Sequence, residues 1–327
     1  MIDKRLLAIF ATMMVLASVP FVAAQPHHQM FQFEESLGVV TITTGEIGVR
    51  VAANGEVPHF AWWNETDPGT DYHVTFLRLF EANDTNENGT FDRGIDPIVG
   101  SAFRLPMDDW VFSGFITEEQ NDVITAIHFN FTNTNTYDHH GPGMTTIPGM
   151  PGMPGHTDPM DVEIQICVHF YLATPDQFKF DLRVSGWEWT STDSILVFQF
   201  AVGESEHNQN ISERDVSRID HEDERFSFDN AWMEYSQHAF AGNASHQVQV
   251  RASHGDPLMA QEHKSIFIAF EYFGDETLDY DPILGITALS TTWTFLGIEY
   301  NQLVLLAGGF SALAIIVIAV KYRNNGT

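Results

Sequence analysis

The sequence is poor in cysteine and in basic residues, and each shortage excludes a class of protein. Cys167 is the only cysteine, so no intramolecular disulfide can form. Lys and Arg together number 15, against 44 Asp and Glu, which gives a net charge of −29. A surface with this charge repels nucleic acid and attracts cations. We therefore expect no nucleic-acid partner, and we expect stability to come from core size and bound ions.

The motifs of the common enzyme classes are also missing. The chain has no G-x-S-x-G, no H-E-x-x-H and no glycine-rich phosphate loop. Its acidic runs, such as Asp220–Glu224, are typical of a solvated surface in so acidic a chain. No catalytic residue is predicted, and an enzyme is less expected than a binding protein. Glycan hydrolysis stays open, because it needs only two well-placed carboxylates.

The two ends of the chain are apolar. Residues 1–24 join two basic residues to an apolar run and a small-residue end, which is the order of a secretory signal peptide. Residues 303–320 carry no charge and are long enough to span a bilayer as a helix. Two basic residues follow in the tail, 321–327, and such residues favour the cytoplasmic side. We expect a single-pass cell-membrane protein with its N-terminal domain extracellular.

Between the ends, the hydrophobic pattern has the period of two that is typical of β-strands. The runs lie at 39–43, 46–53, 57–63, 72–80, 110–115, 123–131, 162–172, 178–189, 195–202, 226–235, 246–252 and 265–273. We predict an all-β ectodomain, an antiparallel β-sandwich, with a C-terminal transmembrane helix. The 26 Phe and 7 Trp suit the inner faces of packed sheets. Asn54-Gly55, between two runs, predicts a hairpin turn.

A stretch rich in Pro, Gly, Met and His, residues 139–160, interrupts the strand pattern. It separates a first β half, 25–138, from a second, 161–286. A juxtamembrane stretch, 287–302, leads to the predicted membrane helix. The halves form either one large sandwich or two consecutive ones, and two is slightly favoured.

The loop DTNENGTFDRGID, residues 84–96, spaces oxygen-bearing side chains as a hard cation requires. The candidate oxygen ligands belong to Asp84, Asn86, Asn88, Thr90 (through its carbonyl), Asp92 and Asp96, and Gly89 supplies the tight turn. The loop resembles the calcium loops of EF-hand, dockerin and thrombospondin type 3 repeats. It departs from the EF-hand at the last position, where Ile95 replaces the bidentate Glu. We predict a structural Ca²⁺ site with a Kd on the order of 10⁻⁴ to 10⁻³ M; the alternative is a solvated turn rich in Asn and Asp.

The sequence also contains acceptor sites for N-glycosylation. The N-x-Ser/Thr motif occurs at Asn64, Asn83, Asn88, Asn130, Asn210 and Asn243. A glycan on Asn88 would occupy the neighbourhood of a proposed calcium ligand. We therefore expect that only some of the six sites are used, and that calcium and a glycan exclude each other at Asn88.

The stretch 139–160 holds a second candidate metal site. Its thioether and imidazole groups belong to His139, His140, Met144, Met150, Met153 and His156. Cu⁺ prefers such soft ligands, and the composition of this short stretch resembles the methionine motifs of copper transporters. The alternative is a linker, because the density of Pro and Gly alone explains the composition.

The whole arrangement resembles uncharacterised archaeal cell-surface proteins: a signal peptide, an acidic β-rich ectodomain, a C-terminal anchor and a short basic tail. The leading hypothesis is a membrane-anchored extracellular protein with a calcium-stabilised β-sandwich. It would bind or scaffold at the cell envelope, in adhesion, wall assembly or glycan binding, with envelope proteins or glycans as partners. One alternative is an envelope copper-binding protein that uses 139–160. A second is an ectoenzyme that acts on glycans.

Overall fold

The structure is a computed structural model that describes residues 31–36, 38–52, 58–137, 159–207, 214–216, 218–255 and 265–287, and two further short strands. The chain divides into two compact units, Met1–Thr287 and Ala288–Thr327. In the second unit, β23 (Thr294–Phe295) pairs with β24 (Ile298–Glu299). The predicted signal peptide, hairpin turn at Asn54-Gly55 and membrane helix lie outside the described residues. Within the described ranges, no helix has the length and apolar character needed to cross a membrane.

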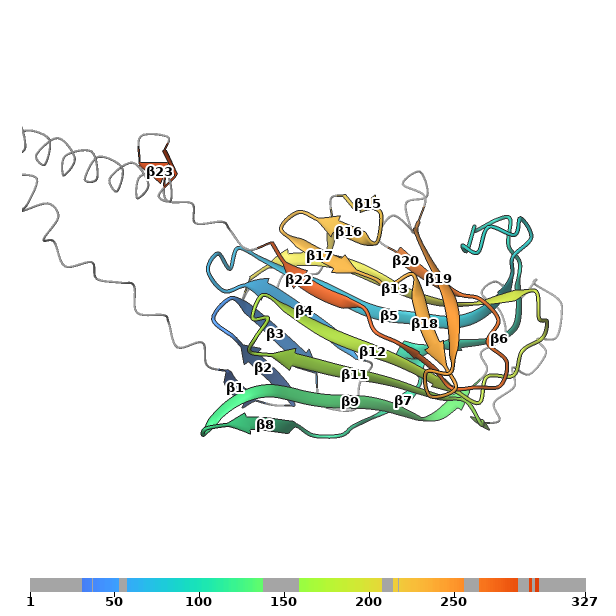
Figure 1. The fold of residues 1–327 in the computed structure, drawn as a ribbon, viewed down its shortest axis with the longest axis horizontal. Helices are drawn as coiled ribbons and strands as arrows, with labels where there is room; N and C mark the ends of the chain where they lie inside the picture. The colour runs from blue at the N-terminus through green and yellow to red at the C-terminus, as the bar shows by residue number, and fades with distance from the viewer. Residues whose placement is uncertain are drawn as a thin grey trace, which may run out of the picture. The chain divides into compact units, whose positions relative to one another are not determined.

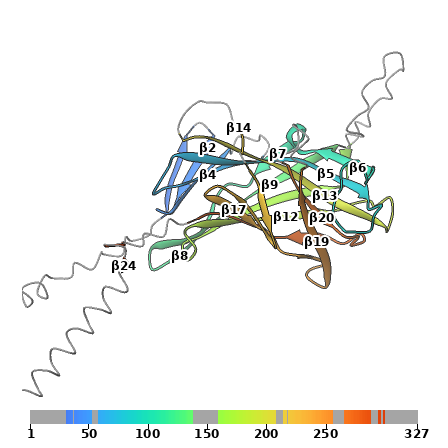
Figure 2. The ribbon, with the colours of Figure 1, turned by 90° about the horizontal axis from the view of Figure 1, so that it is seen from above.

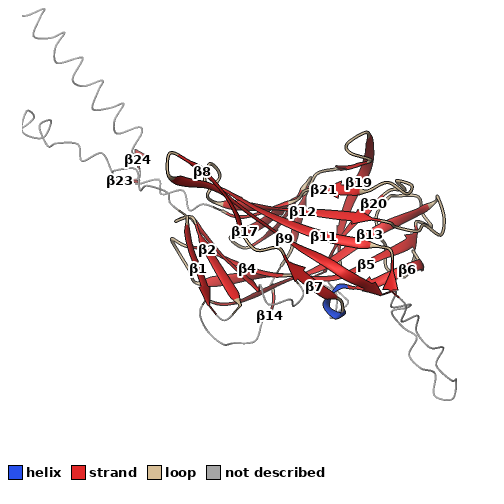
Figure 3. Cartoon of the chain, turned by 90° about the horizontal axis from the view of Figure 1, so that it is seen from below, coloured by secondary structure: helices blue, strands red, loops and turns tan. Residues whose placement is uncertain are grey.

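The first unit consists of antiparallel strands, which confirms the all-β prediction (Figure 1). Twenty-two strands form one continuous hydrogen-bonded sheet. A single 3-10 turn, Leu105–Met107, is the only helical element in the described part of the chain (Figure 3). The sheet is folded so that two sets of strands, which we name the first and second layers, face each other across the core.

The first layer follows the order β1-β2-β3-β4-β5-β13-β20-β19. Two further strands, β6 and β14, pair with the ends of β5 and β13. The strands are β1 (Gln32–Ser36), β2 (Val39–Thr43), β3 (Ile47–Ala52), β4 (His59–Asn64), β5 (Thr70–Asn83), β6 (Ile98–Arg104), β13 (Ser194–Glu206), β14 (Arg214–Asp215), β19 (His246–His254) and β20 (Ser265–Phe270).

The second layer centres on β9, β11 and β12, with β7 and β8 beside β9. On the other side of β12 the sheet divides, through β22 to β17, β16 and β15, and through β21 to β18 and β19. Since β19 pairs with both β18 and β20, it links the layers. The strands are β7 (Asp109–Phe112), β8 (Ile116–Gln120), β9 (Val123–Tyr137), β10 (Pro159–Met160), β11 (Glu163–Tyr171), β12 (Gln177–Ser185), β15 (Asp220–Glu222), β16 (Arg225–Phe228), β17 (Ala231–Glu234), β18 (His238–Ala241), β21 (Leu278–Tyr280) and β22 (Ile283–Ile286).

Both halves of the sequence contribute to both layers, so the expectation of two consecutive sandwiches is wrong. In the first layer, β5 of the first half pairs with β13 of the second half along nearly its whole length (Figure 2). In the second layer, β9 pairs with β11, although the Pro/Gly stretch separates them in sequence. That stretch interrupts the hydrophobic pattern without interrupting the sheet.

The core between the layers is largely aromatic. Phe60 of β4 is fully buried, and its ring centroid lies 6.0 Å from that of Phe178 and 6.4 Å from that of Phe180, both on β12. Trp62 of β4 donates its indole N–H to the carbonyl of Gly285 on β22 at 3.2 Å. Edge-to-face contacts of this kind stabilise a core beyond the area that they bury. The two layers are therefore held together by aromatic side chains that meet across the core.

Three details of the strand pattern differ from the prediction. The run 226–235 is a hairpin, because β16 and β17 are separated by a turn in which Asp229 has a φ of 58°. The run 110–115 ends as a strand at Phe112, before Gly114 with a φ of 78°. All five residues of β8 are exposed, so this strand has no alternation for a hydrophobic pattern to detect.

Candidate functional site

The predicted calcium loop joins the end of β5 to the start of β6. The amide of Asn83 donates to the carbonyl of Pro97 at 3.0 Å and closes the base of the loop. Both carboxylate oxygens of Asp96 accept backbone amides, from Thr85 at 2.9 Å and from Asp92 at 2.7 Å. Asp96 is only 4 % exposed. Its carboxylate therefore holds the two ends of the loop together, which is a different task from the ligand role predicted for it.

Four of the other predicted ligand residues are brought together inside the loop. The carboxylate of Asp84 accepts the amides of Asn88 at 3.2 Å and Gly89 at 2.7 Å. The side-chain amides of Asn86 and Asn88 both donate to Oδ2 of Asp92, at 2.8 and 2.7 Å. Gly89 has a φ of 74°, a conformation that side chains with a Cβ adopt at a cost. The chain therefore turns sharply where the calcium spacing requires it.

Thr90 makes the hydrogen bonds expected of a solvated turn rich in Asn and Asp, which is the alternative to a calcium site. Its amide and its hydroxyl both donate to Oδ1 of Asn88 at 2.7 Å, which makes a local turn of the kind that Asn favours. The loop is thus closed by its own hydrogen bonds. It combines convergent oxygen-bearing side chains with the geometry of a polar turn.

An aromatic anchor fixes the loop to the first layer. Phe91 is 5 % exposed, and its ring centroid lies 5.0 Å from that of Phe80 on β5 and 5.2 Å from that of Phe267 on β20. The carbonyl of Phe91 accepts the hydroxyl of Ser253 on β19 at 3.2 Å. These contacts form a small second core, so the polar half of the loop stands on a fixed base.

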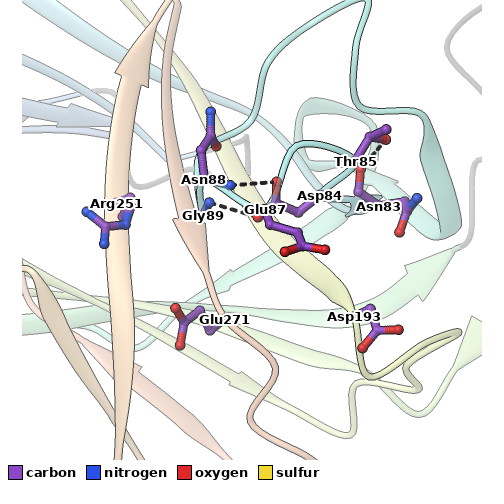
Figure 4. A pocket seen from close by; sticks show the side chains of 9 residues that line it. All are labelled: Asn83, Asp84, Thr85, Glu87, Asn88, Gly89, Asp193, Arg251 and Glu271. Atoms are coloured by element: carbon purple, nitrogen blue, oxygen red, sulfur yellow. Dashed lines mark hydrogen bonds between the residues drawn. The ribbon is translucent and has the colours of Figure 1, made fainter.

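An open pocket of about 540 Å³ lies beside the loop (Figure 4). Its lining residues are Asn83, Asp84, Thr85, Glu87, Asn88, Gly89, Asp193, Arg251 and Glu271. Four of them carry carboxylates and one a guanidinium, so the lining is acidic. A Cβ on Gly89 would lie 3.0 Å from Cδ of Arg251, so glycine lets the loop approach this side chain.

Three residues of this pocket come from segments outside the loop and were not predicted from the sequence: Asp193, Arg251 and Glu271. They belong to the segment before β13, to β19 and to the segment after β20, all far from the loop in sequence. Only strand order brings them to it. No local spacing in the sequence carried that information.

A second polar cluster, on the second layer, was also missed. His128 and His169 lie opposite each other on β9 and β11, with their Nδ1 atoms 2.7 Å apart. Nε2 of His169 contacts Oδ2 of Asp181 at 3.2 Å, and Nε2 of His128 lies 3.4 Å from a carboxylate oxygen of Glu118. Burial, and then the neighbouring His169, lower the pKa of His128, while Glu118 opposes this shift. Burial alone would raise the pKa of Asp181, but the hydrogen bond from His169 and the charge of Lys179 lower it overall.

The pKa of a third histidine, His221, makes stability depend on pH. His221 stacks on Phe226 with ring centroids 4.2 Å apart, and its Nε2 lies 2.9 Å from the hydroxyl of Tyr235. Burial, and then the charge of His254, lower the pKa of His221 below its ordinary value of 6.5, while the carbonyl of Asp223 opposes this shift. The unfolded chain therefore takes up this proton at a higher pH than the folded protein, and stability is lost as the pH falls through 6.5.

We predict that the urea midpoint of the wild type falls more steeply between about pH 7.5 and pH 5 than that of His221→Gln. Glutamine keeps a polar partner for Tyr235 but cannot take up the proton. The exposed His246, which lies 3.3 Å from Glu276, provides the control, His246→Gln. Parallel pH curves for the wild type and His221→Gln would show that His221 does not contribute in this way.

The candidate glycosylation sites differ in their exposure to solvent. Asn243 is exposed in the turn between β18 and β19 with a φ of 56°, and Asn88 is exposed in the loop. Asn83 and Asn130 are half-buried. Asn64 is only 7 % exposed, and its Oδ1 accepts the amide of Thr66 at 2.8 Å. The site at Asn210, and the candidate copper ligands His139, His140, Met144, Met150, Met153 and His156, lie outside the described residues.

Comparisons with known proteins give only distant structural similarity. No protein-family model and no curated protein sequence matches the chain. Two solved heparinase III structures, one of them with methylated lysines, each have a TM-score of 0.35 and 10 % identity, and cover 81 % and 80 % of this chain. Heparan sulfate lyase HepC from Pedobacter heparinus has a TM-score of 0.31 and 11 % identity, over 79 % of this chain. The chain spans 35 to 37 % of the length of these proteins.

Proposed function

We propose that the chain is a membrane-anchored extracellular surface protein, whose β-sandwich binds calcium at the loop 84–96 and binds a partner in the adjoining pocket. The observation that carries this proposal is the overlap of loop and pocket. Asp84, Asn88 and Gly89 belong to both. An ion that fixed the loop would therefore also fix one wall of the pocket.

The hydrogen bonds inside the loop support a calcium site. The two amide groups that donate to Asp92 belong to Asn86 and Asn88. Turning an Asn side-chain amide by 180° exchanges its N–H₂ donor for its carbonyl oxygen in nearly the same place. Such a turn of Asn86 would direct its carbonyl oxygen and the Asp92 carboxylate to one point, an arrangement that a cation stabilises. Oδ1 of Asn88 stays with its donors on Thr90. Ca²⁺ accepts carboxylate and amide oxygens in flexible geometry.

The charges of the pocket favour a particular class of partner. Asp84, Glu87, Asp193 and Glu271 supply acceptors, and Arg251 supplies donors. Hydroxyl-rich and cationic groups find hydrogen-bond partners in such a lining, whereas strongly anionic groups are repelled. Glycans and envelope proteins at a cell surface fit this description. The copper-binding and glycan-cleaving alternatives have no specific observation in their favour among the described residues.

Thermal unfolding with calcium, with magnesium and with EDTA tests the calcium site. With a Kd of about 10⁻⁴ to 10⁻³ M, 10 mM Ca²⁺ would stabilise the folded state by about 1.4 to 2.7 kcal/mol. For a domain of this size, that corresponds to a rise in Tm of roughly 3 to 10 °C. Magnesium should have a smaller effect, because it keeps its water ligands.

The matched variants are Asp84→Asn and Asp67→Asn. Asp67 lies in an exposed turn between β4 and β5, away from the loop. The calcium-dependent increment in Tm should disappear in Asp84→Asn and persist in Asp67→Asn. An equal increment in both variants would place the bound calcium elsewhere on the acidic surface.

The exposure of the glycosylation sites gives a further prediction. In a glycosylating host, Asn243→Gln should lose the mass of one glycan, because Asn243 is exposed at a turn. Asn64→Gln should leave the attached glycan mass unchanged, because the Asn64 side chain is buried and hydrogen-bonded. Mass spectrometry of the intact chain and of its tryptic peptides distinguishes the two. A glycan found on Asn64 would contradict the prediction.

A further inference from the structure

The paired histidines of the second layer face away from the core. Their neighbours Phe129 and Phe170 are at most 2 % exposed and point into it, and alternate residues of a strand point to opposite faces. The side chains of His128 and His169 are 18 % and 21 % exposed. Solvent and ions therefore reach both rings. Because the two residues are directly opposite in the register of β9 and β11, the backbone holds the rings side by side.

The nitrogens that face each other are at nearly the spacing of two ligands on one ion. The Nδ1 atoms are 2.7 Å apart. Two imidazole nitrogens on a tetrahedral ion, each about 2.05 Å from it, are separated by about 3.3 Å. The rings therefore need to part by only about 0.6 Å, which small side-chain rotations supply.

The outer nitrogens have the partners that metal-binding histidines use. Nε2 of His169 contacts the carboxylate of Asp181, and Nε2 of His128 faces that of Glu118. In metal sites, a carboxylate that accepts the second ring N–H fixes the tautomer and leaves the other nitrogen free to bind the ion. His169 has such a hydrogen-bonded carboxylate in Asp181, and Glu118 lies 3.4 Å from Nε2 of His128 as an ion-pair partner.

We propose that His128 and His169 bind one divalent transition-metal ion, Zn²⁺ or Cu²⁺, through their Nδ1 atoms. Glu118 and Asp181 position the two rings. Imidazole suits both ions, and Cu²⁺ should bind the more tightly. Over the described ranges, no group of three or more His, Cys, Asp or Glu is arranged to hold a metal, so water completes the coordination.

The neighbouring charges set the strength of the site. Lys179 lies 3.2 Å from Asp181 and 2.8 Å from Asp281. It therefore shares the Asp181 carboxylate with His169. Its positive charge also weakens the binding of a nearby metal cation. The carboxylate of Glu118, with a side chain 67 % exposed, favours the cation. The site is separate from the calcium loop and does not depend on the proposed function.

Competition with a chromophoric chelator tests the site in the full chain, with Zn²⁺ or Cu²⁺ added alone. The triple variant His139→Gln, His140→Gln, His156→Gln serves as the background, so that the Met/His stretch does not contribute. In this background, His128→Gln or His169→Gln should weaken the tightest binding at least tenfold. Asp181→Asn should weaken it about tenfold, as is usual for a residue that orients a ligand. The control His246→Gln should change nothing.

A footprint on the unsubstituted chain keeps the test independent of folding defects in the variants. Diethyl pyrocarbonate modifies accessible imidazoles, and mass spectrometry locates the products. Zn²⁺ should protect His128 and His169 and leave His246 reactive. Equal reactivity of the pair with and without Zn²⁺, or loss of tight binding in the triple variant alone, would overturn the proposal.

Discussion

Replacing Glu81 with Gln is expected to lower the free energy of unfolding by about 3 kcal/mol. Glu81 of β5 is fully buried, and its carboxylate accepts the amides of Thr190 at 3.0 Å and Ser191 at 3.2 Å, and the hydroxyl of Ser194. Glutamine can keep one oxygen for Ser191 and Ser194, but its N–H₂ group would replace the second oxygen and face the amide of Thr190. A buried donor without an acceptor costs the full desolvation penalty, and a lost charge-assisted bond adds to it.

The site around Glu81 leaves little room for relaxation. A Cβ on Gly100 would lie 2.4 Å from Oε2 of Glu81, so the strand β6 packs closely against the carboxylate. Urea unfolding of Glu81→Gln, beside the exposed Glu119→Gln on β8, measures the effect. A loss below about 1 kcal/mol, equal to that of the control, would show that the buried carboxylate is not a structural anchor.

The hydrogen bonds of Glu81 also hold part of the pocket beside the calcium loop. The segment held by Glu81 continues to Asp193, which lines the pocket. Its hydrogen bonds therefore fix a wall that does not belong to the calcium loop. In Glu81→Gln, the calcium-dependent rise in Tm should survive, because Asp84 and Asp92 are unchanged.

Replacing Phe60 with Ala should cost about 3 to 5 kcal/mol, the range for a large buried aromatic side chain. Phe60 is fully buried and contacts four other rings, those of Phe76, Phe131, Phe178 and Phe180. These rings come from both layers. Removing Phe60 would leave a cavity at the point where the layers meet, and the surrounding strands can close it only in part.

Phe33→Ala provides the matched control, because Phe33 is 46 % exposed on β1. It should cost less than about 1 kcal/mol. Denaturant unfolding followed by tryptophan fluorescence measures both variants. If the two substitutions had the same effect, Phe60 would not be the junction between the layers.

Much of the architecture was predictable, because many strands of the core have one buried and one partly exposed face. In β12, alternate residues from Phe178 to Val184 are buried, which is the pattern that the sequence displays. β8 has no buried residue and could not be detected in this way. The turn at Asp229 was missed because aromatic residues on both sides continue the hydrophobic run. The pairing of β5 with β13 depends on contacts between distant segments, which no local pattern records.

The candidate site also has a part that was predictable from the sequence and a part that was not. The loop 84–96 was predictable because its oxygen-bearing side chains are close in sequence. Arg251 and Glu271 join it only through the order of β19 and β20. The opposition of His128 and His169 depends on register, and a shift of one residue would have placed the two rings on opposite faces. Sequence spacing therefore identifies groups within one loop, and strand pairing decides the groups that span several strands.

Titration calorimetry of the full chain with Ca²⁺ tests the central proposal most directly. We expect binding with a Kd on the order of 10⁻⁴ to 10⁻³ M, much weaker binding of Mg²⁺, and loss of the Ca²⁺ signal in Asp84→Asn but not in Asp67→Asn. If the wild type and Asp84→Asn bound Ca²⁺ equally, or if neither bound it, the loop would be a polar turn that stabilises itself by its own hydrogen bonds. The proposal of a calcium-stabilised pocket would then be wrong.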